Sequence, residues 1–199
     1  MSRNSTTFPN PGNRIAVIGA TGSGKTTLAQ RLGDILDLHV IELDALHWMP
    51  SWTEKPWPDI RADLDPMTRQ DRWITDGNYS QMCDLTWPRA DTIIWLDYPF
   101  LSIFFRLFIR TLKRVFLEIE LWNGNRERFR DNFLSRDSLF VWLVTSRPKH
   151  RKNYPLAFQE PQHAHLQVLR FTRPRQTERC LKNLKNDQTS TKMTNYFSH

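Results

Sequence analysis

The stretch Gly19-Ala20-Thr21-Gly22-Ser23-Gly24-Lys25-Thr26, followed by Thr27, decides the fold that we expect for this chain. It matches the pattern G-x-x-x-x-G-K-[ST] of loops that bind phosphate groups. Residues 14–18 precede it as a short apolar run with the β-branched side chains of a buried strand. After it we predict a helix over residues 25–37, with one apolar face made of Leu28, Leu32, Ile35 and Leu36. Strand, glycine-rich loop and helix in this order are the context in which the pattern forms a phosphate site.

Each part of this loop has a physical role in holding a phosphate chain. Glycines let successive backbone N–H groups turn toward an anion, and the helix N-terminus adds a partial positive charge. We expect Lys25 to reach the β- and γ-phosphates and the Thr26 hydroxyl to ligate magnesium. The sequence therefore predicts ATP and Mg²⁺ as cofactors, with the nucleotide held by Gly19, Thr21, Gly22, Ser23, Gly24, Lys25, Thr26 and Thr27.

Length and composition indicate one folded domain. The 199 residues suffice for a sizeable core, and an aromatic content of 12% argues against disorder throughout. Cys83 and Cys180 lack the spacing of a metal site or a disulfide framework, which favours a reduced, cytoplasmic protein. Residues 1–7 lack the apolar core of a signal peptide, and the most apolar run, residues 98–109, is too short to span a bilayer. We therefore predict no membrane segment.

The positive charge is concentrated in the middle of the chain. Residues 100–155 contain 12 Lys and Arg against 5 Asp and Glu, a net charge of +7 that equals that of the whole chain. Such a concentration indicates an element that faces an anion, either a nucleoside triphosphate, a phosphorylated product or nucleic acid. The alternative is a basic face that contacts only solvent.

Predicted strands and helices alternate along the chain. Beyond the first pair we expect strands at residues 39–44, 72–76, 92–97 and 165–171, and helices near residues 60–67, 100–122, 126–144 and 174–184. Alternation of this kind predicts an α/β fold with a parallel sheet, right-handed crossovers and functional groups at the carboxyl ends of the strands. The predicted parts are a flexible segment 1–13, one domain 14–185 with a basic helical lid at about 100–155, and a disordered tail 186–199.

Three aspartates fall at the ends of predicted strands. Asp76 is our first choice for a second metal ligand beside Thr26, and the alternative is an ordinary turn aspartate before Gly77. Asp97 is a competing metal ligand. We expect Asp44 to orient or deprotonate an acceptor hydroxyl, or to contact magnesium through water; a strand-end or helix-cap role explains it equally well.

Basic residues of the predicted lid are candidates to neutralise charge during phosphoryl transfer. Arg106 and Arg110 are one helical turn apart and can face the same anion, which arginine contacts in a bidentate manner. The structural alternative is a salt-bridged or solvated helix face. Further basic residues would join when a flap closes: Arg147, Lys149, Arg151 and Lys152.

The loop after the second predicted strand is rich in aromatic residues. Trp48, Trp52 and Trp57 form either an aromatic pocket or the core of a small flap. His47 is better explained as a packed or surface histidine than as a catalytic one.

Four stretches together resemble a known group of proteins. They are residues 19–27, residues 43–48 (Leu-Asp-Ala-Leu-His-Trp), residues 73–79 (Trp-Ile-Thr-Asp-Gly-Asn-Tyr) and residues 91–97 (Asp-Thr-Ile-Ile-Trp-Leu-Asp). They are similar to the adenylate-kinase-related P-loop proteins called DNA topology modulation proteins, over about residues 14–185. The resemblance implies a three-layer nucleoside-monophosphate-kinase-like fold with strand order 2-3-1-4-5, and Asp76-Gly77 at the Walker-B-like position. It also implies that Arg173 contacts the adenine.

One departure from that pattern bears on the acceptor. Adenylate kinases continue Asp-Gly-Phe-Pro-Arg, and the arginine holds the phosphate of the acceptor nucleotide, whereas here Asn78-Tyr79-Ser80 follows Asp76-Gly77. We therefore expect an acceptor other than AMP bound in the usual way. The sequence predicts a Mg²⁺-dependent phosphotransferase acting on an unidentified small molecule or nucleotide. The alternative is a regulatory or DNA-associated NTPase, although the chain has no recognised DNA-reading motif.

Overall fold

A five-stranded parallel sheet forms the centre of the computed structural model, which describes residues 10–126 and 138–196. Its strands lie in the order β2-β5-β1-β6-β7. In that order their bounds are Val40–Glu42, Trp73–Asp76, Arg14–Gly19, Thr92–Leu96 and Gln167–Phe171. Numbered among themselves along the chain, these strands have the order 2-3-1-4-5, which confirms the predicted α/β fold and topology.

The central strand β1 is buried on both faces of the sheet. Ile15 and Val17 belong to one core cluster, while Ala16 and Ile18 belong to the other. This split follows from the alternation of side chains along a strand. It explains why the run before the glycine-rich loop is apolar throughout.

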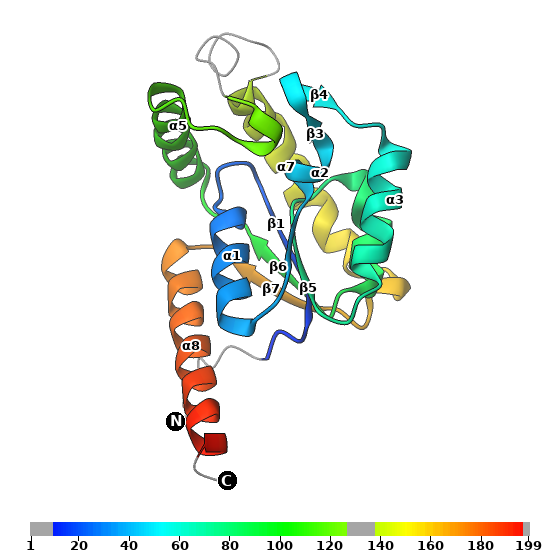
Figure 1. Ribbon diagram of the computed structural model, residues 1–199, viewed down its shortest axis with the longest axis vertical. Coiled ribbons are helices and arrows are strands. Elements are labelled where there is room, and N and C mark those ends of the chain that lie inside the picture. Colours follow the sequence, from blue (N-terminus) through cyan, green and yellow to red (C-terminus); the bar gives the residue numbers. More distant parts are fainter. Residues whose placement is uncertain (1–9, 127–137, 197–199) are drawn as a thin grey trace.

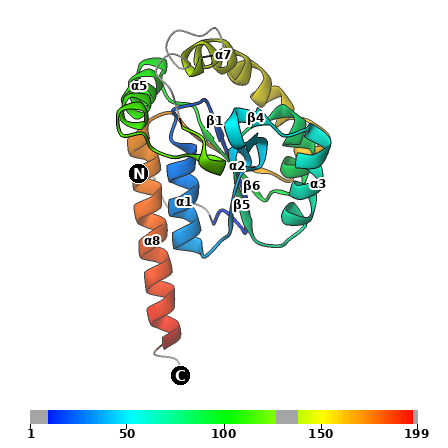
Figure 2. The ribbon, with the colours of Figure 1, turned by 45° about the horizontal axis from the view of Figure 1, so that its top comes forward.

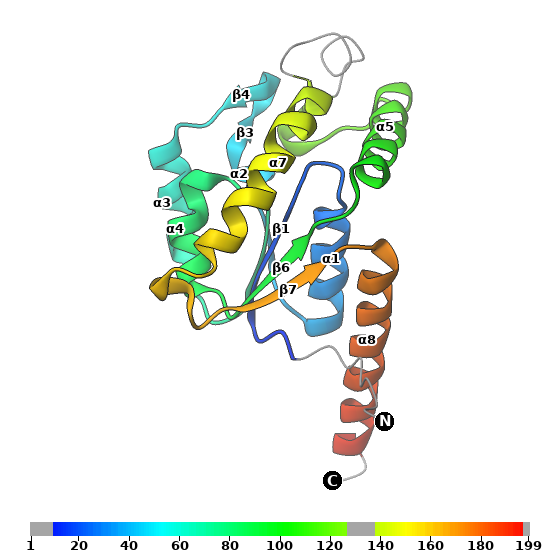
Figure 3. The same ribbon diagram turned by 180° about the vertical axis from the view of Figure 1, so that it is seen from behind.

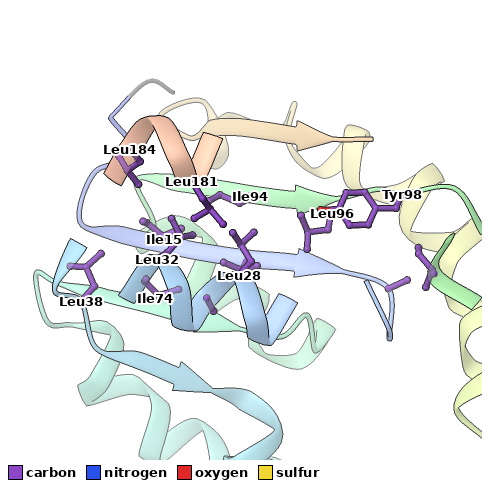
Figure 4. Packing of buried hydrophobic residues seen from close by; sticks show 14 of the residues in the cluster. Ile15, Leu28, Leu32, Leu38, Ile74, Ile94, Leu96, Tyr98, Leu181 and Leu184 are labelled. Atoms are coloured by element: carbon purple, nitrogen blue, oxygen red, sulfur yellow. The ribbon is translucent and has the colours of Figure 1, made fainter. Parts of the chain in front are cut away.

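Helices α1 (Lys25–Leu36) and α8 (Pro174–Tyr196) lie side by side on one face of the sheet (Figure 1). Figure 4 shows Leu28 and Leu32 of α1, with Leu181 and Leu184 of α8, against β1 and β6. All four leucines are buried. Complete burial of a leucine contributes about 1.5–3 kcal/mol, so this layer stabilises the sheet beneath the loop.

The opposite face is covered by α3 (Trp57–Thr68), α4 (Cys83–Thr86) and the second half of α7 (Leu139–Ala157), as Figure 3 shows. Ile60 and Leu64 of α3 and Tyr154 of α7 pack there with Trp73 and Trp95 of the sheet. Two helical layers on a parallel sheet give the three-layer arrangement.

Helix α5 (Phe100–Phe116) and the first half of α7 lie over the end of the sheet at which the strands finish (Figure 2). Both helices belong to the basic segment, so the structure brings that segment to the carboxyl edge of the strands. The smaller elements are α2 (Leu43–His47), β3 (Trp48–Met49), η1 (Pro50–Trp52), β4 (Thr53–Glu54), η2 (Ser80–Met82), η3 (Trp87–Arg89), η4 (Trp122–Gly124) and η5 (Pro161–His163). Among the residues that the structure describes, no helix is long and apolar enough to cross a membrane.

Several predicted boundaries are wrong. Helix α5 ends at Phe116 rather than near residue 122, and α7 runs from Leu139 to Ala157 through Pro148 and Pro155. The two prolines do not end α7 because buried residues on both sides, Leu143 and Tyr154, pack it against the molecule.

The predicted terminal segments differ in outcome. Helix α8 continues to Tyr196, so the prediction of a disordered tail is wrong for residues 186–196. This stretch has no glycine or proline, and adding a residue to an existing helix is easier than starting one. Residues 1–9 of the predicted flexible segment, residues 127–137 of the predicted helix 126–144 and residues 197–199 of the tail lie outside the described residues.

Candidate active site

The glycine-rich loop joins β1 to α1, as the sequence predicts, and wraps the N-terminus of α1. Gly22 (φ 76°) and Gly24 (φ 96°) have left-handed backbone conformations that other residues rarely adopt. A Cβ atom at Gly22 would lie 2.7 Å from the Cβ of Leu107 on α5. The loop therefore requires glycine both for its conformation and for the close approach of α5.

Lys25 is the first residue of α1, and its ammonium group donates a hydrogen bond to the Ala20 carbonyl oxygen at 3.3 Å. Burial lowers the pKa of Lys25, while the negative charges of Asp76 and Asp44 partly offset that effect. The ammonium group thus lies between the loop and both aspartates. This is the place from which it can reach the end of a phosphate chain.

Asp76 is the last residue of β5, and its register partner on β1 is Val17, so it stands beside the loop. The residue is buried, and its Oδ1 has no hydrogen-bond partner among the described residues. Burial raises the pKa of the Asp76 carboxyl group, against the charge of Lys25 and a hydrogen bond from Thr26. A buried carboxylate oxygen left without a partner calls for a ligand that is not part of the chain.

The residues beside the loop fit a magnesium ion. Mg²⁺ prefers oxygen ligands and is commonly bound through one or two carboxylates together with phosphate oxygens. Asp76 supplies a carboxylate with a free oxygen, and the exposed Thr26 supplies a hydroxyl beside it. Both donors were selected from the sequence, and the fold brings them together.

Asp44 lies in the short helix α2, directly after β2, rather than in the strand itself. The Tyr79 hydroxyl donates a hydrogen bond to Asp44 Oδ1 at 2.6 Å, which orients the carboxylate and leaves its second oxygen for another partner. Burial, together with the neighbouring Asp44, raises the pKa of Tyr79, so this hydroxyl stays protonated. Asp44, like Asp76, lies close enough to Lys25 for its charge to act on the ammonium group.

Arg106 and Arg110 of α5 both lie near the loop. A Cβ atom at Gly24 would stand 2.9 Å from Arg106 Nη2, and the Arg106 guanidinium lies 5.8 Å from the centre of the Tyr98 ring. The positive charge of Arg110 contributes to the lowered pKa of Lys25. The structure therefore brings both predicted arginines to the phosphate end of the site.

Asp97, the competing metal candidate, is engaged by arginines. Its side chain is only 2% exposed; Arg170 and Arg151 pair with Oδ2, and Arg147 Nη2 is 3.9 Å from Oδ1. Arg170 also stacks on Trp95, with its guanidinium 4.5 Å from the ring. These contacts dock α7 on the sheet, and they favour Asp76 over Asp97 as the free carboxylate.

Three residues that were not selected from the sequence connect α7 to the loop region. Asn78 Nδ2 donates to the Tyr154 hydroxyl at 2.9 Å and lies 3.4 Å from His150 Nε2. The rings of His150 and Tyr154 stack at 4.8 Å between centroids. Burial, with the charge of Lys25, lowers the pKa of His150 to about 4. The spacing of His150 and Tyr154, one helical turn apart, was the available signal, but it lies in a run of basic residues.

The tryptophan-rich loop forms a flap. Strands β3 and β4 pair as a hairpin, and Trp48 and Trp52 meet edge to face at its base. His47 is buried and stacks on Trp57 at 4.8 Å between ring centroids. The flap-core alternative therefore describes Trp48 and Trp52, and His47 is a packed histidine.

Arg173 is the predicted site residue that follows the last strand of the sheet. It lies in the exposed turn between β7 and α8, where its backbone N–H donates to Gln176 Oε1 at 3.0 Å. The turn is at the carboxyl edge of the sheet. Its predicted adenine contact stays a prediction.

Comparison with known proteins finds similarity in structure only. No protein-family model and no curated protein sequence matches the chain. The shikimate kinase of Acinetobacter baumannii, solved with shikimate, is similar with a TM-score of 0.53 and 15% identity, over 90% of this chain and 94% of that one. The shikimate kinase of Bacteroides thetaiotaomicron is similar with a TM-score of 0.50 and 18% identity, over 87% and 97%.

The chain has the fold of the P-loop kinases. This supports the broader part of the resemblance stated above. The narrower part, to the DNA topology modulation proteins, stays a prediction.

Proposed function

We propose that the protein is a phosphotransferase that moves the γ-phosphoryl group of ATP to a hydroxyl group of a small molecule. The observation that carries this proposal is the pair of carboxylates, Asp44 and Asp76, whose charges both act on Lys25. Asp76 has a free buried oxygen next to Thr26, and Asp44 is oriented by Tyr79. The negative charges of both aspartates raise the pKa of Lys25 against the effect of burial. One carboxylate suits a metal and the other an acceptor.

The chemistry follows from these positions. The acceptor hydroxyl oxygen bonds to the γ-phosphorus while the bond from that phosphorus to the bridging oxygen of ADP breaks, and Asp44 takes the hydroxyl proton. The loop N–H groups and Lys25 hold the phosphates, and Arg106 and Arg110 balance the charge that develops on the transferred group. Magnesium, held by Thr26 and Asp76, supplies further neutralisation of phosphate charge.

A screen of acceptors tests the proposal. Purified protein with labelled ATP and Mg²⁺ is offered nucleosides, nucleotides, sugars and hydroxy acids, and we expect a labelled phosphoester with at least one class. Lys25→Ala should lower turnover by about 100-fold or more, because it removes a charged contact to the transferred group. ATP hydrolysis without any phosphorylated product, or unchanged turnover in Lys25→Ala, would contradict the proposal.

The alternative, a DNA-associated NTPase, predicts a different behaviour. Binding through phosphate contacts weakens steeply as salt rises, with about one counterion released per contact. DNA affinity measured between 50 and 200 mM salt, as an order-of-magnitude window, separates the two. We expect no steep dependence, because Arg147, Arg151 and Arg170 are engaged with Asp97.

A further inference from the structure

The described residues contain a small set of buried polar atoms without a hydrogen-bond partner, and several lie around the loop. One is Asp76 Oδ1 and another is the Ser23 hydroxyl, both already part of the site. His150 Nδ1 belongs to the same set but comes from α7. A buried nitrogen without a hydrogen-bond partner needs an explanation of its own.

The contacts of His150 determine which of its nitrogens carries the proton. The hydrogen-bond network orients Asn78 so that its Nδ2 donates to the Tyr154 hydroxyl and faces His150 Nε2 at 3.4 Å. A donor opposite Nε2 makes that nitrogen the acceptor, which leaves the ring proton on Nδ1. The stacked Tyr154 ring holds the imidazole plane. His150 therefore presents a fixed N–H donor.

The location of His150 indicates which kind of atom accepts the hydrogen bond from its Nδ1–H. His150 Nε2 lies 3.4 Å from Nδ2 of Asn78, which is two residues beyond the end of β5 beside the loop. Burial, and after it the charge of Lys25, lowers the pKa of His150, in agreement with this position. A loop lysine of this kind contacts β- and γ-phosphates. The oxygen atoms that a bound nucleotide brings beside Lys25 are therefore phosphoryl oxygens, and these accept strong hydrogen bonds.

We propose that His150 is a γ-phosphate ligand, donating from Nδ1 to an oxygen of the phosphoryl group that Lys25 holds. This inference rests on the nucleotide site of the proposed function. It gives α7 a direct role in sensing whether the third phosphate is present. Asn78, which follows Asp76-Gly77, then positions His150.

The experiment compares the affinities for ATP and ADP, measured by calorimetry with Mg²⁺ and without any acceptor. His150→Phe keeps a ring against Tyr154 but has no donor, and we expect it to weaken ATP binding by about tenfold with ADP binding unchanged. His150→Asn places an amide nitrogen near the position of Nδ1 and should keep most of the preference for ATP. His150→Gln reaches the position of Nε2 instead and should lose it. The exposed His165→Asn is the control.

The outcomes separate this inference from the proposed function. Equal weakening of ATP and ADP, or no change for either, in both His150→Phe and His150→Gln would overturn the role of His150. The Asn and Gln variants decide the matter if His150→Phe fails to fold. A wild-type protein that shows the expected ATP preference but phosphorylates no acceptor would instead overturn the proposed function alone.

Discussion

Two aspartates at the ends of strands that flank β1, Asp76 and Asp97, have opposite surroundings. Asp76 is the last residue of β5 and keeps a buried oxygen without a partner among the described residues, whereas Asp97 follows β6 and is paired with arginines from α7 and β7. In the sequence they are alike, since each ends an apolar strand. What distinguishes them is the set of charges that the fold brings to each one.

Replacing Asp76 by asparagine should therefore affect turnover, whereas replacing Asp97 by asparagine should affect stability. Asp76→Asn should lower Mg²⁺-dependent turnover by about 100-fold with little loss of stability, because it removes a buried charge that burial already disfavours. Asp97→Asn should lower the free energy of unfolding by about 1–3 kcal/mol, because the arginines lose their partner. Urea unfolding and a magnesium titration of turnover measure both effects. If Asp97→Asn lowered the Mg²⁺-dependent turnover and Asp76→Asn did not, Asp97 and not Asp76 would be the metal ligand.

The flap is an element that a buried amide helps to hold, beside bonds from Asn123 to the Trp48 carbonyl oxygen and from Trp52 Nε1 to the Arg126 carbonyl oxygen. Asn125 is 3% exposed; its Nδ2 donates to the Met49 and Trp122 carbonyl oxygens, and its Oδ1 accepts from the Trp52 N–H. These bonds join the β3–β4 hairpin to η4, so the segment after α5 holds the aromatic flap. This contact between distant segments is not visible in the sequence.

Removing that amide should loosen the flap. Asn125→Ala removes the side-chain bonds to the Trp52 N–H and the Met49 carbonyl oxygen, while the Trp122 carbonyl oxygen keeps its bond from the backbone N–H of residue 125. The loss should cost about 1–3 kcal/mol of stability. Faster hydrogen exchange of residues 48–54, with little change in the exchange of the sheet, is the expected signature. The exposed Asn153→Ala is the control. Unchanged exchange in the hairpin would mean that the aromatic packing and the bonds of Asn123 and Trp52 Nε1 hold the flap without Asn125.

The local hydrophobic pattern predicted helices and strands well where its periodicity was strong, and poorly elsewhere. The strands around the loop and helix α1 were predicted because each has a continuous apolar run or one apolar face. Helix α7 was placed wrongly because its prolines suggest an end, while Leu143 and Tyr154 anchor it through contacts with other elements. Boundaries depend on such contacts, which a local pattern does not contain.

At the scale of the whole molecule, the described core contacts of α8 come from its first half. Leu181 and Leu184 pack in the core beside α1, and Arg31 of α1 pairs with Glu178. We expect a chain that stops after Thr189 to keep its melting temperature, since its core contacts are intact. A chain that stops after Glu178 should lose about 3–6 kcal/mol, the burial of two leucines. Thermal unfolding compares them, and a large loss from the shorter deletion would mean that the end of α8 has core contacts of its own.

The sequence by itself determined the loop, the strand and helix around it, and the class of ligand, because all of these depend on residues that are neighbours along the chain. It also selected Asp44 and Asp76, since parallel strands finish at one edge, and Arg106 and Arg110, since residues one helical turn apart share a face. Only the tertiary structure decided which aspartate keeps an unpartnered oxygen, which arginines pair with Asp97, and that His150 lies buried beside Asn78 and Tyr154. The physical reason is that the hydrogen-bond partners, ion pairs and burial of a side chain depend on atoms that are distant in the chain. These properties decide whether a candidate residue is available to a ligand.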